Sequence, residues 1–338
     1  MADDEANPDE EALVSTFFAP LAAGYPGALD LKDDCALIEP APGSDLVVTT
    51  DAIAEGVDFL PGACAADVGW KALAVNVSDL AAKGARPVAY LMALSFPQAP
   101  GRDWLAAFTT GLSQAQKAFG INLAGGDIDR RPGPLSATVT AFGSVAHGTM
   151  VPRTRAQAGD RLFVSGTLGD AALGLDLRRS PQLAASWSLT PEEGAHLVAR
   201  YDRPQPRLAL RQALLAHARA AMDVSDGLVK DLSRMCAASQ SGNPLGAILE
   251  AARLPLSPAA TKAIAADPGL TRAALAWGDD YEVLAAVPPH AARAFADQAL
   301  ADGCPVCEIG WITAQPGVHV VGTDGQPIAL ARTGWDHF

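Results

Sequence analysis

The 338-residue sequence is short of basic residues, with 25 Lys and Arg against 38 Asp and Glu and a formal net charge of −13. Such an acidic chain lacks the basic face with which proteins bind nucleic acids or anionic membranes. It also lacks an apolar run of about 18 residues, the length that spans a membrane, and Val88–Phe96 is long enough only for a strand. The first residues, MADDEANPDEEALV, lack the positive start and apolar run of a signal peptide, so we expect a solvated lead-in to a helix.

Cysteines are few. The five cysteines are spread without a disulfide framework, so we expect reduced thiols and a cytoplasmic location. Cys304 and Cys307 form one CxxC pair, but a zinc site needs two further ligands and no second ligand pair accompanies them. We interpret this pair as structural or incidental.

Several common catalytic motifs are missing. The sequence has no GxxxxGK[ST] phosphate loop and no GxGxxG dinucleotide fingerprint. It has no GxSxG, no HExxH and no kinase HRD/DFG pair. Asp127-Ile128-Asp129 begins like a calcium loop but lacks the Gly and the distal Glu. The six histidines do not form the cluster that a histidine-metal site needs.

The composition predicts a folded chain with a sizeable core, because 49% of the residues are hydrophobic and 19% are charged. At about 100–200 residues per domain, the length predicts two domains. Periodicity predicts strands at 46–50, 88–96, 135–145, 161–164, 247–251, 281–287 and 307–313, and helices at 67–83, 104–119, 207–218 and 227–238. A loop-like stretch at 147–160 divides the chain into domains 1–148 and 149–338, and we interpret 179–188 as a surface excursion. We predict an α/β fold with mixed (α+β) sheets in two domains rather than one doubly wound sheet.

Aspartates fall repeatedly at the ends of apolar runs, beside small residues. Six segments share this pattern: Asp33-Asp34-Cys35-Ala36, Thr49-Thr50-Asp51, Asn76-Val77-Ser78-Asp79, Gly125-Gly126-Asp127, Asp223-Val224-Ser225-Asp226-Gly227 and Gly278-Asp279-Asp280-Tyr281-Glu282. Carboxylates gathered at strand ends repel one another, so they need cations or raised pKa values. Hard oxygen ligands in that number suit Mg²⁺, which in turn suits phosphate.

Each segment also has a simpler interpretation. Asp79 shares a helix face with Asn76 and Lys83, so it is either a ligand at the edge of the core or the solvent-exposed partner of Lys83. Ser225 is a good helix N-cap with Asp226 in the first turn, where the helix dipole favours an anion, so this motif is either a cap or a ligand. Gly125-Gly126 would let backbone N–H groups approach a phosphate, but one GGD is weak evidence.

Together these segments resemble the thiamine-monophosphate kinase family, within the superfamily that includes aminoimidazole-ribonucleotide synthetase and selenophosphate synthetase. The resemblance runs from about residue 30 to the C-terminus and rests on DDCAL, TTDAIAEGVDF, KALAVNVSDLAAKGARP, GGDID, RxxAxxGD, VSGTLGDAALGL, MDVSDGL and GDDYEVL. Any one motif is weak, whereas eight in order are specific. The resemblance implies direct in-line transfer of the ATP γ-phosphoryl group to thiamine monophosphate, giving thiamine diphosphate and ADP.

The resemblance also implies roles for residues. The implied Mg²⁺ ligands are Asp34, Thr49, Thr50, Asp51, Asp79, Asp127, Asp223 and Asp226, of which Asp127 and Asp223 are the expected catalytic residues. The implied ATP contacts are Gly126, Asp127, Arg153 and Ser225, and the implied substrate contacts are Asp58, Asp279 and Trp335. Asp58 stands where the family commonly has His, and cannot donate a hydrogen bond to a phosphate unless protonated. Asp279 stands where the family commonly has Glu. Asp33 is interpreted as structural, and Trp335 alternatively as a plain C-terminal anchor.

The family pattern further implies a homodimer whose N-terminal domains pair in a β-barrel, with nucleotide in a cleft between the domains. ATP and several Mg²⁺ ions are the expected co-substrate and cofactor, with no nucleic-acid or membrane partner. One rival is a sister synthetase acting on another acceptor, which GDDYE and the C-terminal GWDHF disfavour. The other is a non-catalytic nucleotide- or metal-binding regulator, which the complete aspartate set disfavours.

Overall fold

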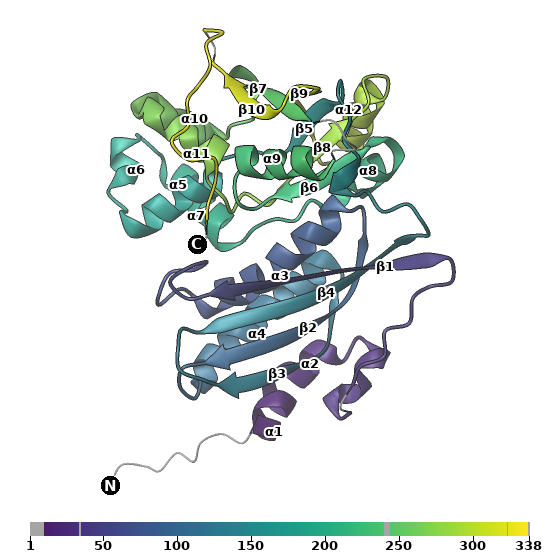
Figure 1. Ribbon diagram of the computed structural model, residues 1–338. Coiled ribbons are helices and arrows are strands. Elements are labelled where there is room, and N and C mark those ends of the chain that lie inside the picture. The colour runs from purple at the N-terminus through teal and green to yellow at the C-terminus, as the bar shows by residue number, and fades with distance from the viewer. Residues whose placement is uncertain (1–9, 34, 240–243, 323, 337–338) are drawn as a thin grey trace. The chain divides into compact units, whose positions relative to one another are not determined.

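A computed structural model describes residues 10–33, 35–239, 244–322 and 324–336 (Figure 1). The chain divides into two compact units, one made of Met1–Leu80 and Arg86–Gly148 and the other of Ala81–Ala85 and Thr149–Phe338. Each unit combines one β-sheet with helices, which confirms the predicted mixed α/β class. None of the described helices combines the length and apolarity that crossing a membrane requires. Asp34 lies outside the described residues.

The first unit contains a four-stranded sheet in the order β1-β4-β2-β3. Its strands are β1 Ser44–Ala54, β2 Arg86–Phe96, β3 Asn122–Arg130 and β4 Ser136–Ala146. β4 pairs antiparallel with β1 and β2, whereas β3 pairs parallel with β2. β1 and β3 are therefore the two edges of this sheet.

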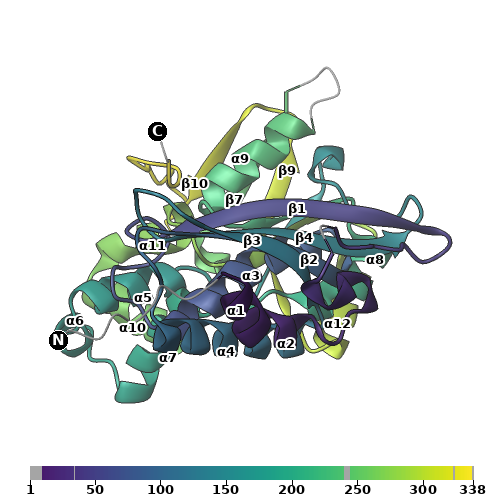
Figure 2. The same cartoon turned by 90° about the horizontal axis from the view of Figure 1, so that it is seen from below.

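Two long helices, α3 (Ala65–Ala82) and α4 (Arg102–Phe119), lie on the same side of this sheet (Figure 2). They cross at two glycines, because a Cβ at Gly69 would lie 2.2 Å from the Phe108 carbonyl oxygen and one at Gly111 would lie 1.9 Å from the Ala66 carbonyl oxygen. α4 ends at Gly120 in the left-handed conformation, as the sequence predicts. The short helices α1 (Glu10–Leu13) and α2 (Ala19–Ala22) precede β1, and α2 contacts β3.

The second unit contains a six-stranded sheet in the order β10-β7-β9-β5-β8-β6. Its strands are β5 Arg161–Ser165, β6 Ala220–Val224, β7 Gly246–Glu250, β8 Glu282–Val287, β9 Val306–Thr313 and β10 Gly317–Val321. β7 and β10 are parallel, and the other neighbouring pairs are antiparallel. Its helices are α5 Asp170–Arg179, α6 Leu183–Ser186, α7 Pro191–Asp202, α8 Arg211–His217, α9 Leu228–Ala238, α10 Pro258–Ala266, α11 Thr271–Ala276 and α12 Ala292–Ala301.

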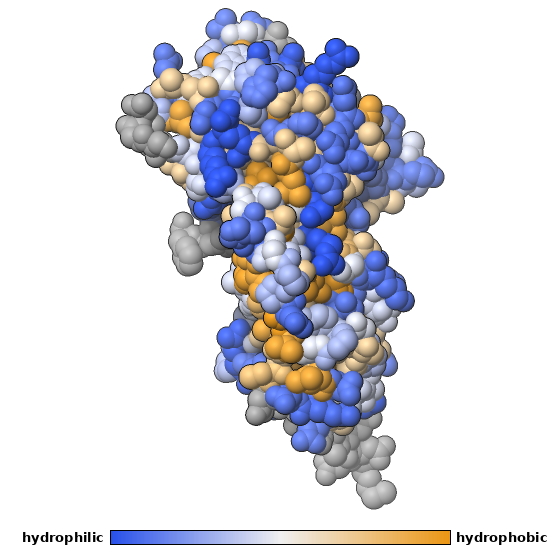
Figure 3. All heavy atoms as spheres, turned by 90° about the vertical axis from the view of Figure 1, so that its right-hand side faces the viewer, coloured by the Kyte–Doolittle hydropathy of each residue, from blue (hydrophilic) through white to orange (hydrophobic). Residues whose placement is uncertain are grey.

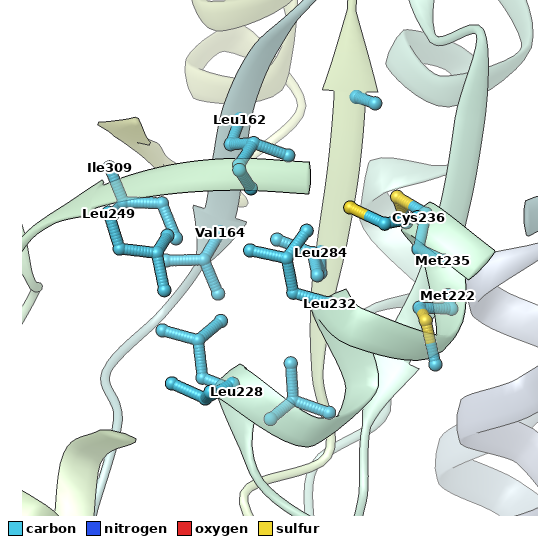
Figure 4. Packing of buried hydrophobic residues seen from close by; sticks show 14 of the residues in the cluster. Leu162, Val164, Met222, Leu228, Leu232, Met235, Cys236, Leu249, Leu284 and Ile309 are labelled. Carbon is cyan, nitrogen blue, oxygen red and sulfur yellow. The ribbon is translucent and has the colours of Figure 1, made fainter. Parts of the chain in front are cut away.

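Alternate side chains of β8, which lies between β5 and β6, enter two different cores, as the two-residue period of a strand requires. Leu284 packs with Leu228 and Leu232 of α9 (Figure 4). Val283 belongs instead to a cluster with residues of α8 and α12, including Phe295. All six residues of β8 are therefore buried, and this strand fixes the position of the residues that immediately precede it.

The structure corrects several sequence expectations. The strand expected to end at Asp51 continues to Ala54, and Asp51 pairs with Val139 in the middle of a ladder. The expected N-cap at Ser225 is wrong, because α9 begins at Leu228 with Gly227 as its N-cap residue. The strands β3, β6 and β10 were not expected. In β3 the glycines at 125 and 126 break the apolar pattern that identifies a strand.

Two expected segments differ in detail. The helix expected at 207–218 is a 3-10 turn, Leu208–Leu210, followed by α8. The stretch 179–188, expected as a surface excursion, contains α6 and leads into Trp187, which is buried among hydrophobic side chains of α7 and α10. Burial of the large Trp187 ring against these side chains is favourable because it removes apolar surface from water.

Candidate active site

At the β1 edge of the first unit, the structure brings together oxygen atoms from β1 and α3. The Thr49 hydroxyl donates a 2.5 Å hydrogen bond to Oδ2 of Asp79. One turn earlier on α3, the fully buried Asn76 side chain accepts from the Asp51 N–H at 2.9 Å and donates to the Asp51 carbonyl. Asn76 thus satisfies the backbone of the edge strand, and Thr49 and Asp51 alternate onto the face that α3 covers.

Asp127 lies on the other edge of the same sheet. Residues directly opposite one another run Ala52, Thr138, Ala93 and Asp127 across the four strands. At about 4.8 Å per strand, Asp127 stands roughly 14 Å from β1. It lines a hollow of about 780 Å³ with Thr138 on the face away from α3. Within one copy of the chain, Asp127 therefore lies far from Asp51 and Asp79.

Thr50 and Gly126 have clear local roles. The Thr50 hydroxyl bonds across the sheet to the Val139 carbonyl and lies 3.1 Å from the Thr140 hydroxyl, so it faces away from Thr49. A Cβ at Gly126 would lie 2.0 Å from the Met92 carbonyl oxygen. Glycine is thus required at 126 by the close approach of β3 to β2, whatever else binds there.

Asp58 closes the turn that follows β1. Its Oδ2 accepts a 2.8 Å hydrogen bond from the Ala54 N–H, and its carbonyl oxygen accepts one of 2.8 Å from Lys71 Nζ. Lys71 is almost fully buried. The Asp58 side chain therefore has a structural bond in addition to any contact with a substrate.

In the second unit, one loop connects most of the expected site residues. Asp223, buried on β6, leads into Val224, Ser225 and Asp226. The carbonyl oxygens of these last three residues accept hydrogen bonds of 2.9 Å from the N–H groups of Tyr281, Asp279 and Trp335 respectively. Two segments distant in sequence are thereby fixed to the loop Val224–Asp226.

The backbone of the GDDYE segment is strained. Asp279 and Tyr281 adopt left-handed conformations with φ of 70° and 50°, which side-chain-bearing residues rarely occupy. A Cβ at Gly278 would lie 2.1 Å from the Ser225 carbonyl oxygen. Strain of this kind persists only where the surroundings impose it.

Buried charged side chains hold the GDDYE segment in this strained conformation. Arg200 donates to the Asp280 carbonyl at 2.9 Å and to Glu282 at 2.8 Å. Arg207 also pairs with Glu282, whose Oε2 accepts a 2.6 Å bond from the Ser165 hydroxyl. The Asp280 carboxylate accepts from the Gly169 N–H, and burial raises the pKa of Asp280 well above its usual value.

The Trp335 ring is 41% exposed and lies 6.4 Å, between centroids, from the ring of Trp277, which is 39% exposed. The Trp335 carbonyl accepts a hydrogen bond from Lys230 Nζ. The backbone of this residue is thus anchored on both sides while its ring stays accessible. The hydrogen bonds of its backbone fit the anchor interpretation, and its ring is partly exposed.

Asp226 and Arg153 complete the expected set in this unit. Asp226 Oδ2 lies 2.6 Å from Arg234 and 3.4 Å from Lys230. Arg153 is exposed in a 3-10 turn, Arg153–Arg155, and its carbonyl accepts a hydrogen bond from Ser239. The turn contacts β6, so Arg153 stands near the strand that carries Asp223.

The donor set fits Mg²⁺ by its chemistry, since carboxylate and hydroxyl oxygens are the ligands that this ion prefers. The part of the chain that the structure describes nevertheless contains no ready group of three or more His, Cys, Asp or Glu side chains. Among the expected ligands, the Thr49 hydroxyl and the Asp79 carboxylate lie 2.5 Å apart. Cys304 and Cys307 lie in no such group either, and Cys307 donates to the Arg253 carbonyl.

Sequence reasoning missed the residues that hold this site in place, above all Asp231, Arg200, Arg207 and Ser165. Their side chains are buried or half-buried and charged or polar. A lone charge inside a helix pattern gives no sequence signal that distinguishes a buried partner from a solvated one.

Comparison with known proteins identifies the family. Residues 32–145 match the N-terminal domain model of AIR synthase related proteins, and residues 157–323 match the C-terminal one. The chain is 39% identical over 335 residues to the thiamine-monophosphate kinase of Caulobacter vibrioides, covering 98% of this chain and 92% of that protein. It is 38% identical to the enzyme of the same name from Escherichia coli K12, covering 92% of each.

Solved structures agree. The thiamine-monophosphate kinase of Stenotrophomonas maltophilia superposes with a TM-score of 0.78 at 40% identity, covering 88% of this chain and 91% of that one. AaThiL complexed with AMPPCP and TMP superposes with a TM-score of 0.76 at 30% identity, covering 90% and 91%. Escherichia coli HypE, a hydrogenase maturation protein, shares the fold at 21% identity, with a TM-score of 0.76 over 97% and 99%. The chain therefore belongs to the thiamine-monophosphate kinase family of AIR synthase related proteins.

Proposed function

We propose that this chain transfers the γ-phosphoryl group of ATP to thiamine monophosphate, producing thiamine diphosphate and ADP for thiamine diphosphate biosynthesis. The observation that carries this proposal is the loop Val224–Asp226, whose carbonyl groups hold Asp279 and Trp335 beside Ser225 and Asp226. Residues expected to contact the nucleotide thus lie next to residues expected to contact the acceptor. Relatives of this name match nearly the whole chain, and one related structure contains AMPPCP and TMP.

The residues of the second unit suit a cationic substrate with a phosphate. The accessible Trp335 ring can receive a thiazolium or pyrimidine ring, and Asp279 supplies a nearby negative charge. Arg153 can meet a phosphate through its guanidinium. The acceptor phosphate is already a nucleophile, so in-line transfer needs no side-chain base and no phospho-enzyme.

The two phosphates repel each other, so their approach requires cations. This acidic chain has few basic side chains of its own. Mg²⁺, when bound, screens that charge and stabilises the transferring group. We assign its binding to the carboxylates and hydroxyls already named: Asp34, Thr49, Thr50, Asp51, Asp79, Asp127, Asp223 and Asp226. Arg234 and Lys230 neutralise Asp226 in the structure, so a cation there must compete with two basic side chains.

A homodimer formed by the first units would complete this set. Leu46 and Val48 on β1 are 37% and 55% exposed, on the sheet face that α3 and α4 do not cover. Hydrophobic side chains also reach the surface in several patches on the side drawn in Figure 3. Pairing of two such faces in a β-barrel would bury these residues and bring β3 of one copy toward β1 of the other. Asp127 and Asp51, on opposite edges within one chain, could then act together.

The five cysteines are free, in keeping with a reducing cytoplasm.

Release of ADP from Mg-ATP tests the function when thiamine monophosphate, free thiamine and an aminoimidazole-pathway substrate are offered in parallel. We expect turnover with thiamine monophosphate alone, with thiamine diphosphate and ADP formed in equal amounts. Turnover with another acceptor would instead identify a sister synthetase. Tight Mg²⁺-dependent ATP binding without turnover would identify a regulator.

A further inference from the structure

Asp231 holds the loop that carries Ser225 and Asp226. It lies on the first turn of α9 and is fully buried. Its Oδ2 accepts hydrogen bonds from three consecutive N–H groups, those of Ser225 at 3.1 Å, Asp226 at 2.9 Å and Gly227 at 3.1 Å. Three converging N–H groups form a concave site that commonly receives an anion, and here the protein fills it with its own carboxylate.

The second carboxylate oxygen of Asp231 orients a neighbouring side chain. Oδ1 accepts a 3.0 Å hydrogen bond from Arg234 Nη1, and the same nitrogen lies 2.6 Å from Asp226 Oδ2. Arg234 thereby joins the buried carboxylate of Asp231 to the half-buried carboxylate of Asp226. The direction in which Asp226 points thus depends on Asp231 through this bridge as well as through the backbone.

The opposite side of the same loop holds the acceptor half of the site. The N–H groups of Ser225 and Asp226 point to Asp231, whereas their carbonyl groups receive the N–H groups of Asp279 and Trp335. Removal of Asp231 would leave three buried or half-buried N–H groups without their acceptor, a cost that the loop can avoid only by moving. Movement of the loop would carry Asp279 and Trp335 with it.

We propose that Asp231 is a positioning residue for phosphoryl transfer, which touches neither substrate but sets the loop on which both halves of the site depend. This inference rests on the proposed function, because the roles of Ser225, Asp226, Asp279 and Trp335 come from it. An effect on both substrates follows from the geometry, since the loop serves both halves. A residue that only stabilises the fold would lower the melting temperature without changing the KM for either substrate.

The test compares Asp231→Leu, which removes the acceptor, with Asp231→Asn, which keeps one oxygen for the three N–H groups. Asp160→Leu is the matched control, because Asp160 is also buried, accepts from the Gln157 N–H and pairs with Arg219. The measurements are the melting temperature, kcat and KM for thiamine monophosphate and Mg-ATP, and hydrogen exchange of the peptide spanning residues 225–227.

We expect Asp231→Leu to speed exchange at 225–227 and to lower kcat/KM for both substrates by about 100-fold, the effect of a misplacement near 1 Å. Asp231→Asn should keep the exchange rate at 225–227 and kcat/KM for both substrates within about tenfold of the wild type. Asp160→Leu should lower the melting temperature without changing the KM for either substrate. If Asp231→Leu does not fold, Asp231→Glu serves instead, because one added methylene keeps the charge but displaces the loop.

Faster exchange with kcat/KM within twofold of the wild type would overturn the inference, as would an equal kinetic loss in Asp160→Leu. Slow exchange retained in Asp231→Leu would overturn it too, because the loop would then not depend on Asp231. Failure of the proposed function is distinguishable, since the wild type itself would then show no turnover with thiamine monophosphate, whereas the exchange comparison needs no turnover.

Discussion

The hydroxyl of Thr49 donates a 2.5 Å hydrogen bond to the carboxylate of Asp79, joining the edge strand β1 to helix α3. Both residues belong to the predicted metal set. A hydrogen bond from a hydroxyl to a carboxylate keeps the two oxygens adjacent. The first unit thus holds two of the oxygens that we propose as Mg²⁺ ligands next to each other.

Asp79→Asn should raise the Mg²⁺ concentration needed for half-maximal turnover by about tenfold or more, because the amide keeps the shape but removes the charge that attracts the cation. Titration of turnover with Mg²⁺ at saturating ATP measures this. Asp103→Asn, on the exposed face of α4, is the control and should leave the titration unchanged. An unchanged Mg²⁺ requirement in Asp79→Asn would remove this residue from the metal set.

Asp58→Asn tests one of the two positions, Asp58 and Asp279, at which the family resemblance leads us to expect a different residue. The amide oxygen can still accept from the Ala54 N–H, so the turn should persist. If the carboxylate lies beside the substrate phosphate, loss of its charge should lower the KM for thiamine monophosphate by about fivefold, near 1 kcal/mol of repulsion at close range. Steady-state kinetics with thiamine monophosphate varied measures this, and the KM for ATP is the internal control. An unchanged KM would restrict Asp58 to its structural bond.

If the proposed homodimer forms, Val48→Lys should convert it to a monomer, because a charge would replace an exposed apolar side chain in the proposed barrel interface. Light scattering coupled to gel filtration measures the mass. Turnover should fall together with the mass. Asp127 and Asp51 lie on opposite edges of one sheet, so a single copy would not bring them together. Leu300→Lys, at a site 65% exposed on α12 of the second unit, is the control. A Val48→Lys variant that stays dimeric would rule out this face.

Asp170 should make stability depend on pH. Burial raises its pKa, but hydrogen bonds from His196, Ser257 and Thr167 lower it more, so the pKa is below its usual value. A lowered folded-state pKa contributes stability above the unfolded pKa, near 3.9, and loses it as the pH falls through the folded value. Asp170→Asn should therefore cost about 2 kcal/mol at pH 7 and progressively less below about pH 4.

Urea unfolding at a series of pH values measures the difference between Asp170→Asn and the wild type. Asp297→Asn, on the exposed side of α12, should show no difference at any pH. A constant difference between pH 7 and pH 3 would contradict the lowered pKa of Asp170.

The sequence alone determined most long elements and the family. The apolar spacing of α3 and α4 and the glycine after α4 specify these helices locally, since amphipathic periodicity and a left-handed cap need no distant partner. The aspartate motifs likewise predict which carboxylates bind Mg²⁺, because each stands beside small residues in a fixed order along the chain.

Tertiary structure alone decided where those carboxylates point and what holds them. Asp51 is inside a strand rather than after it because β4 supplies a ladder partner, and Asp127 lies on the opposite edge because the strand order separates β1 from β3. Asp231 falls in an expected helix as an ordinary helical charge, and Arg200 falls in a stretch where the sequence predicted no element. Both side chains are buried and form hydrogen bonds with backbone groups that the fold brings to them. The type of a residue alone predicts neither its burial nor these partners.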